Sequence, residues 1–142
     1  NEVSICHMLA SAVIYNSAFF TVSEDPSILK EHGLYSFVSP LPVVWNETHV
    51  LTGSKIGEIA IFARRSKKSW YAAVFNGAQG ERKINLPFSF LKDGTKYEAE
   101  IYTDNLTDQR GYNKVKIAVT SADSADIAMR PSGGFAAVFR EI

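Results

Sequence analysis

The sequence has few of the residues on which metal and nucleophile sites depend. Its 142 residues include one cysteine, Cys6, and three histidines, His7, His32 and His49. A single cysteine excludes an intrachain disulfide and a cysteine-based zinc site, and no two histidines have the spacing of a zinc motif. Lys plus Arg and Asp plus Glu number 15 each, so the formal net charge is zero. A neutral chain lacks the electrostatic basis for binding nucleic acid or an anionic membrane, and we expect neither as a partner.

The sequence shows neither a signal peptide nor a clear membrane span. Residues 3–22 are uncharged apart from His7 and long enough to be considered as a span. Scattered polar residues and the absence of flanking Lys or Arg argue against one. The spacing instead predicts a single helix over 3–22 that is apolar nearly all round. Such a helix must be buried on more than one side, so we expect a partner outside this chain and self-association of the isolated chain through the helix.

The remaining pattern predicts a short helix and then strands. Pro26 and Gly33 suit the start and end of a helix over 26–32, and "SPLPVVW" at 39–45 resembles a linker. Short strand-like segments separated by turn residues follow, at 43–51, 56–64, 69–76, 81–86, 96–103, 114–120, 124–130 and 135–141. Without helices between them, these segments predict a mainly β fold. The expected architecture is an antiparallel two-sheet β-sandwich of about eight strands, preceded by a helical segment.

The most patterned stretch is "GEIAIFARRSKKSWYAAVFNG" at 57–77. Strands 56–64 and 69–76 are apolar on both faces near their middles, which predicts a central position in the sheet. "RRSKK" at 64–68 is then the hairpin connection. It has the composition of an anion-binding patch, but we interpret it as a solvated turn that discourages edge-to-edge aggregation.

Three further groups of residues have the composition of possible sites. Cys6 and His7 are adjacent on the expected helix, where neighbours do not face each other, so they make a poor dyad and His7 is better read as a core histidine. Glu98 and Glu100 share a strand face and could form a glycosidase pair, although the solvent face of an edge strand is the commoner arrangement. "DNLTDQRGYN" at 104–113 offers oxygen ligands for Ca²⁺ but lacks EF-hand spacing, which favours a plain loop.

Aromatic side chains give the remaining binding hypothesis. Exposed rings on a β-sandwich can stack on sugars, and Trp70, Tyr71 and Tyr102 are the candidate stacking residues. Core or cross-strand packing is the competing interpretation. A solvent-facing Trp70 or Tyr102 would favour an oligosaccharide as partner.

Four separated motifs occur in order along the chain: "PVVWNETHVL", "GEIAIFARRSKKSWYAAVFNG", "FLKDGTKYEAEIYTD" and "PSGGFAA". Together with "HMLASAVIYNSAFFTVSEDPSILKEH" near the start, they resemble the C-terminal region of glycoside hydrolase family 97. The resemblance covers essentially the whole chain. It implies that residues 1–40 are the helical end of a catalytic (β/α)₈ barrel and that residues 43–142 form the C-terminal β-sandwich.

The resemblance also implies a parent enzyme. Family members hydrolyse α-glucosides or α-galactosides, by inversion or retention, with a calcium ion near the site. Their catalytic carboxylates and calcium ligands lie upstream of this region, so no catalytic or metal residue is assigned here and no cofactor is expected in this chain. The implied location is the bacterial periplasm or the medium, and the implied partner is the barrel of the same polypeptide.

Three functions remain open from the sequence. The first is a structural one, in which the sandwich stabilises the catalytic barrel without being catalytic. The second is a carbohydrate-binding module that uses exposed aromatics. The third, catalysis by this chain alone, has no candidate residues to support it. We favour the structural function because buried aromatics outnumber functional ones in most domains.

Overall fold

The computed structural model describes residues 3–15, 26–31, 33–108 and 110–142. Within these residues, three helices precede eight strands: α1 (Ile5–Ile14), α2 (Pro26–Glu31), α3 (Tyr35–Val38), β1 (Glu47–Val50), β2 (Ile59–Ser66), β3 (Ser69–Asn76), β4 (Arg82–Pro87), β5 (Tyr97–Asp104), β6 (Tyr112–Val119), β7 (Ser124–Met129) and β8 (Gly134–Glu141). Every predicted strand is present, with ends that shift by a few residues. The short helix before Gly33 is also confirmed, and Gly33 takes the positive φ that ends it.

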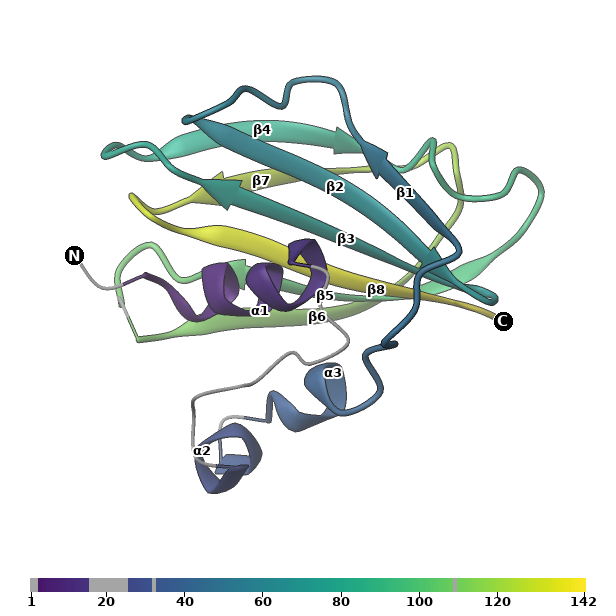
Figure 1. The fold of residues 1–142 in the computed structure, drawn as a ribbon, viewed down its shortest axis with the longest axis horizontal. Coiled ribbons are helices and arrows are strands. Elements are labelled where there is room, and N and C mark those ends of the chain that lie inside the picture. Colours follow the sequence, from purple (N-terminus) through teal and green to yellow (C-terminus); the bar gives the residue numbers. More distant parts are fainter. Residues whose placement is uncertain (1–2, 16–25, 32, 109) are drawn as a thin grey trace.

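The strands form two antiparallel sheets. The large sheet has six strands in the order β1-β2-β3-β8-β5-β6, and the small sheet pairs β4 with β7. Figure 1 shows the small sheet behind the large one and α1 lying across its front. The predicted antiparallel two-sheet sandwich is therefore confirmed, and β2 and β3 lie inside the sheet as expected.

Alternation along β3 divides the interior into two cores. Trp70, Ala72 and Val74 point into the core between the two sheets, whereas Tyr71 and Ala73 point into the core under α1 and α3. We call the side of the large sheet that carries α1 and α3 the helix face, and the side that carries β4 and β7 the sandwich face. The double burial explains why this strand is apolar throughout.

The prediction of one helix over 3–22 is wrong in its extent. The helix ends at Ile14, because Tyr15 adopts an extended conformation; residues 16–22 lie outside the described residues. One side of α1 is fully buried, through Cys6, Leu9, Ala10 and Val13. The close fit depends on Gly134, since a Cβ there would lie 2.8 Å from the His7 backbone nitrogen.

The expectation that "RRSKK" forms a solvated turn is wrong for its first half. Arg64 and Arg65 belong to β2, and only Lys67 and Lys68 make the turn, with φ of 54° at Lys67. Arg64 is 4% exposed. The sequence pattern misses this because an arginine at a strand end normally reaches solvent, whereas the partners of Arg64 come from distant segments.

Within the described residues, no helix has the length and apolar character needed to cross a membrane.

Candidate functional site

The three predicted stacking residues are buried. Trp70 is 6% exposed and lies on the sandwich face, where its ring packs against Phe90. Tyr71 and Tyr102 are 4% and 0% exposed and pack around Phe37 on the helix face. The condition that would favour a sugar platform, a solvent-facing Trp70 or Tyr102, is not met in this structure. Sugar stacking by these rings stays a prediction.

The two carboxylates of β5 have different surroundings. The interpretation of this segment as an edge strand is wrong, because β6 pairs with β5 along its whole length. Glu98 is exposed, but Glu100 is 4% exposed and accepts a hydrogen bond from the Tyr102 hydroxyl. Its oxygens also lie 3.1 Å from Lys114 Nζ and 3.4 Å from Arg140 Nη1. Glu100 is therefore the centre of an ion-pair network that joins β5, β6 and β8.

This network makes the stability of the protein depend on pH. Burial raises the pKa of Glu100, but hydrogen bonds from Tyr102 and Lys114 outweigh burial and hold the pKa below its usual range. A lowered folded-state pKa stabilises the fold above the unfolded value of about 4.3, and this contribution is lost as pH falls through the folded value. We expect the advantage of the wild type over Glu100→Gln in urea unfolding to shrink on acidification below about pH 5.

The exposed neighbour provides the control for this prediction. Glu98→Gln changes a carboxylate on the same strand that lacks the buried network, so its small effect should stay nearly constant across the same pH range. If the wild type exceeds Glu100→Gln in free energy of unfolding by the same amount at pH 3.5 and at pH 6, the network does not stabilise the charged form of Glu100.

The side-chain oxygens of Asn105 and Asp108 accept hydrogen bonds from backbone groups of the same loop, 104–113. Asn105 Oδ1 accepts hydrogen bonds from Thr107 N and Asp108 N, and Asp108 Oδ1 accepts one from Arg110 N. The parts of the chain that the structure describes bring together no group of three or more His, Cys, Asp or Glu that could hold a metal ion. The loop is therefore built as a turn with side-chain caps.

Asp104 fixes the region beneath the start of α1. Its side chain is 3% exposed, and Oδ2 accepts hydrogen bonds from Arg130 N and Gly134 N, both at 3.0 Å. Oδ1 is buried without a hydrogen-bond partner. Burial and the adjacent Asp104 carboxylate raise the pKa of Cys6, so the thiol stays protonated. Cys6 is thus a packing residue rather than a nucleophile.

His7 has a structural role, as the sequence suggested. Its Nδ1 lies 3.1 Å from the Gly133 carbonyl oxygen, and its ring stacks on Phe75 with centroids 4.4 Å apart. His7 and Cys6 therefore contact different groups, and no dyad forms.

Arg64 fixes the opposite end of α1. Its Nη1 donates to the Val13 carbonyl oxygen at 2.8 Å, and its Nε donates to Thr48 Oγ1 at 2.9 Å. The Val13 carbonyl is one of the last four in the helix, which have no intrahelical partner. The guanidinium also lies over the Trp45 ring, 4.5 Å from its centroid. No carboxylate among the described residues pairs with the Arg64 guanidinium. The partial negative charge at the C-terminal end of α1 acts as its counter-charge instead.

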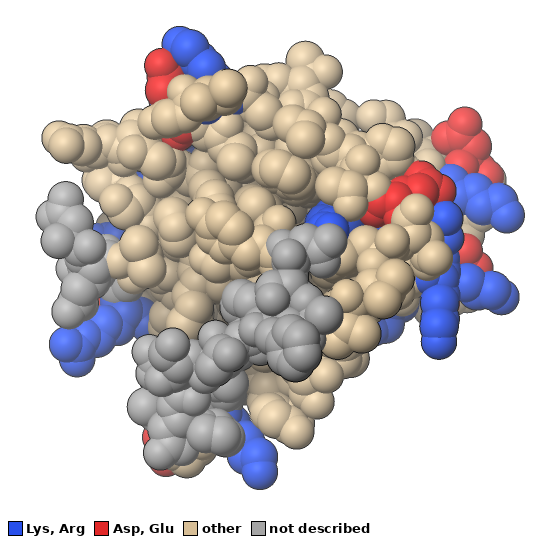
Figure 2. Space-filling model, viewed as in Figure 1, with Lys and Arg blue, Asp and Glu red and all other residues tan. Residues whose placement is uncertain are grey.

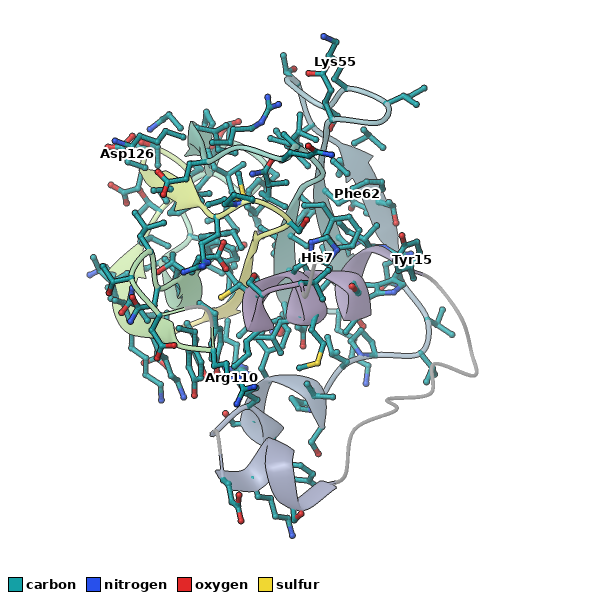
Figure 3. The ribbon with its side chains drawn as sticks, turned by 90° about the vertical axis from the view of Figure 1, so that its left-hand side faces the viewer. His7, Tyr15, Lys55, Phe62, Arg110 and Asp126 are labelled. Atoms are coloured by element: carbon teal, nitrogen blue, oxygen red, sulfur yellow. The ribbon has the colours of Figure 1, made fainter. Side chains whose placement is uncertain are left out.

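Beside the end of α1, the described residues leave a hollow on the helix face. A hollow of about 560 Å³ lies between the helix, β2 and the loop that precedes β2. Its apolar lining residues are Tyr15, Val50, Ile56, Ile59, Ala60, Phe62 and Phe75. Ile56 is fully exposed, and Val50 and Tyr15 are 63% and 62% exposed. Figure 3 shows Phe62 and Tyr15 on the side of the sheet that carries α1, below the loop of Lys55.

Charged side chains are few on the part of this surface that the structure describes. Figure 2 shows a broad area of uncharged residues there, and most of the coloured Lys, Arg, Asp and Glu side chains lie toward the outline of the view. Lys55 and Glu58, at the border of the hollow, form an ion pair at 2.7 Å. Contiguous exposed apolar surface of this kind is typical of an interface. The arrangement holds a well-anchored helix beside an apolar hollow, which suits docking.

Comparisons with known proteins agree with this geometry. Residues 44–140 match a family model described as glycosyl-hydrolase 97 C-terminal, oligomerisation. A retaining alpha-galactosidase of Bacteroides thetaiotaomicron is 30% identical over 135 residues, which cover 92% of this chain and 20% of that protein. The chain therefore spans about a fifth of the length of this curated relative.

Solved structures share the fold. A glycoside hydrolase family 97 enzyme from Pseudoalteromonas sp. strain K8, in complex with acarbose, matches with a TM-score of 0.89 and 24% identity over 99% of this chain and 23% of that chain. A beta-arabinopyranosidase matches with a TM-score of 0.76 and 22% identity over 97% of this chain and 21% of that chain. At these identities the likeness concerns the fold alone.

Proposed function

The chain belongs to glycoside hydrolase family 97 and carries its C-terminal, oligomerisation domain, and from this premise we propose that it is a non-catalytic domain that stabilises the catalytic barrel of the same polypeptide. In this proposal the barrel covers the helix face of the large sheet. Residues 1–40 are the last helical part of the barrel and residues 43–142 are the C-terminal domain. The start of the family match at residue 44 supports that boundary.

The apolar hollow that the described residues leave beside α1 is the observation that carries the proposal. It is lined by Val50, Ile56 and Phe62 and lies next to a helix that is held near its start by His7 and at its end by Arg64. Burying several hundred Å² of such surface at about 25 cal/mol per Å² stabilises an assembly by several kcal/mol. That amount is comparable with the total stability of a domain.

The activity of the whole polypeptide follows by analogy with its relatives. We propose an α-glycosidase, exported to the periplasm or the medium, that acts on α-galactosides or α-glucosides. We propose that the calcium expected in such a parent is held outside this chain, as the family resemblance implies. A carbohydrate-binding role for the sandwich through exposed aromatic rings stays the alternative, although Trp70, Tyr71 and Tyr102 are buried in this structure.

Two highly exposed isoleucines test the docking proposal. Ile56 lies in the hollow and Ile142 lies at the end of the chain, 71% exposed. Since Ile56 is fully exposed here, Ile56→Glu should leave the fold of this domain intact. In the intact polypeptide we expect Ile56→Glu to lower the free energy of unfolding by about 1–3 kcal/mol, because a carboxylate is then buried against the barrel. Chemical denaturation measures the effect.

The matched variant Ile142→Glu makes the same substitution outside the hollow and should change the stability little. If both variants unfold at the denaturant concentration of the wild type, the barrel does not cover the hollow and the proposal fails.

A further inference from the structure

The edge strands of the two sheets differ in what they expose. The large sheet ends at β1 and β6, and the small sheet consists of β4 and β7. β6 is exposed without interruption over residues 113–118, and it carries two large exposed apolar side chains, Val115 at 52% and Ile117 at 50%. β4 and β7 carry none. β1 carries Val50, but that residue lines the hollow described above.

At β1, the other edge of the large sheet, polar side chains of the edge and its neighbours pair with one another. β1 has four residues, and Glu47 pairs there with both His49 and Arg65. The neighbouring Asn46 accepts the Lys67 backbone N–H. A short edge with paired charges resists the addition of another strand. β6 has eight residues, of which 113–118 are exposed, and in the part of the chain that the structure describes the strand that pairs with it is β5.

The family match indicates where assembly takes place. The match to an oligomerisation domain covers residues 44–140, which include β1 to β7 and all but the last residue of β8 and exclude α1, α2 and α3. An assembly surface for a second copy is therefore sought on the sheets and not on the helices. The helix face is assigned to the barrel in the proposed function, which leaves the exposed stretch 113–118 of β6, with Val115 and Ile117, as the long edge among the described strands.

From these observations we propose that two copies of the polypeptide pair through β6, antiparallel and edge to edge, about a two-fold axis at Ile117. The occupant of the edge is thus a second copy of this chain. The two large sheets become one continuous sheet, and the contact is isologous, as in most closed dimers. The inference rests on the proposed function, because it assigns a surface to the assembly of that domain.

The lysines of β6 determine the register. In an antiparallel pair related by a two-fold axis, a residue n positions before the axis faces the residue n positions after it. An axis at Val115 sets Lys114 opposite Lys116 of the partner, and an axis at Lys116 sets that residue opposite itself. An axis at Ile117 sets Lys116 opposite the partner's Ala118 and Val115 opposite the partner's Val119. This register joins apolar side chains on the sandwich face without opposing two lysines, which would repel.

A pair of cysteine substitutions in the intact polypeptide tests the register. Ile117→Cys sets two thiols directly opposite each other, at a Cβ separation of about 4.5–5.5 Å that slight movement closes to a disulfide. Val115→Cys is equally exposed on the same face, but its two copies lie four residues apart along the strands, about 13 Å. Under mild oxidation we expect a covalent dimer from Ile117→Cys and none from Val115→Cys. Mass spectrometry must find the linked peptide at position 117. The opposite pattern, or no covalent dimer from Ile117→Cys, overturns the inference.

A second variant tests assembly without oxidation. We expect Ile117→Glu to raise the dimer dissociation constant at least about tenfold in sedimentation, because two carboxylates then meet on the axis. Ile142→Glu is the matched control and should sediment as the wild type does. An unchanged dimer in Ile117→Glu overturns the inference. The proposed function is judged separately, since Ile56→Glu reports on barrel docking whether or not β6 pairs.

Discussion

Asp104→Ala is expected to lower the free energy of unfolding by about 2–4 kcal/mol. Its Oδ2 is the acceptor for the backbone N–H groups of Arg130 and Gly134. The alanine variant leaves both donors without their partner beside a fully buried strand end, and each unsatisfied donor costs about 1–3 kcal/mol. Because Gly134 lies directly under α1, the helix should loosen with it. Urea unfolding measures the loss, and near-ultraviolet circular dichroism reports the loosened packing.

Asp104→Asn is the matched variant. It keeps one oxygen as acceptor for the two backbone donors, and it removes a buried negative charge whose second oxygen has no hydrogen-bond partner. We therefore expect a stability close to that of the wild type. If the asparagine variant is as unstable as the alanine variant, the charge of Asp104 is essential and the assignment to the two backbone donors is wrong.

Arg64→Ala is expected to have an effect of similar size, about 2–4 kcal/mol. The truncation removes the donor to the Val13 carbonyl, the hydrogen bond to Thr48 and the cation over Trp45. The helix end then keeps an unpaired carbonyl, and the indole loses a packing partner. We expect α1 amides to exchange faster with deuterium in the variant, while β4 and β7 amides change little.

Arg65 offers a control from the next position. Its side chain lies on the surface, where it pairs with Glu47 at 2.8 Å and donates to the Lys67 carbonyl oxygen. Surface pairs contribute little to stability, so Arg65→Ala should unfold nearly as the wild type does. Equal effects of the two alanine variants would show that the contact of Arg64 with α1 contributes nothing particular.

These two anchors give the helix face its shape. Asp104 holds the backbone at Gly134, against which the start of α1 packs, and Arg64 holds the other end of the helix against β2. The helix is thereby fixed at one side of the apolar hollow, so that a partner meets a preformed surface. Preformed surfaces bind more tightly because less conformational freedom is lost on association.

The strand pattern was predictable because it depends on local alternation. Segments such as 69–76 are apolar on both faces, and that property alone indicates a strand between two layers. The edges of the sheet were not predictable in the same way. Glu98 and Glu100 gave the appearance of an edge strand, but the pairing of β6 with β5 is a long-range choice that no short window reveals.

The anchors of the helix face were missed for a related reason. Arg64 looks like part of a basic turn, and its partners Val13 and Trp45 are far away along the chain. Asp104 opens a polar loop, and nothing near it signals that the loop at Gly133 folds back onto it. The sequence does contain a pair of glycines in "PSGG" at 131–134. That other backbone segments approach these glycines closely becomes evident only in three dimensions.

Hydroxyl-radical footprinting of the intact polypeptide shows whether the barrel covers the helix face. Ile56 and Ile142 are both strongly exposed in this domain, so their rates of oxidation can be compared within one molecule. If the barrel covers the helix face, Ile56, Val50 and Tyr15 are protected while Ile142 is oxidised at the rate of an exposed isoleucine. Oxidation of Ile56 as fast as Ile142 would contradict the account, because the hollow would then be open to solvent in the complete protein.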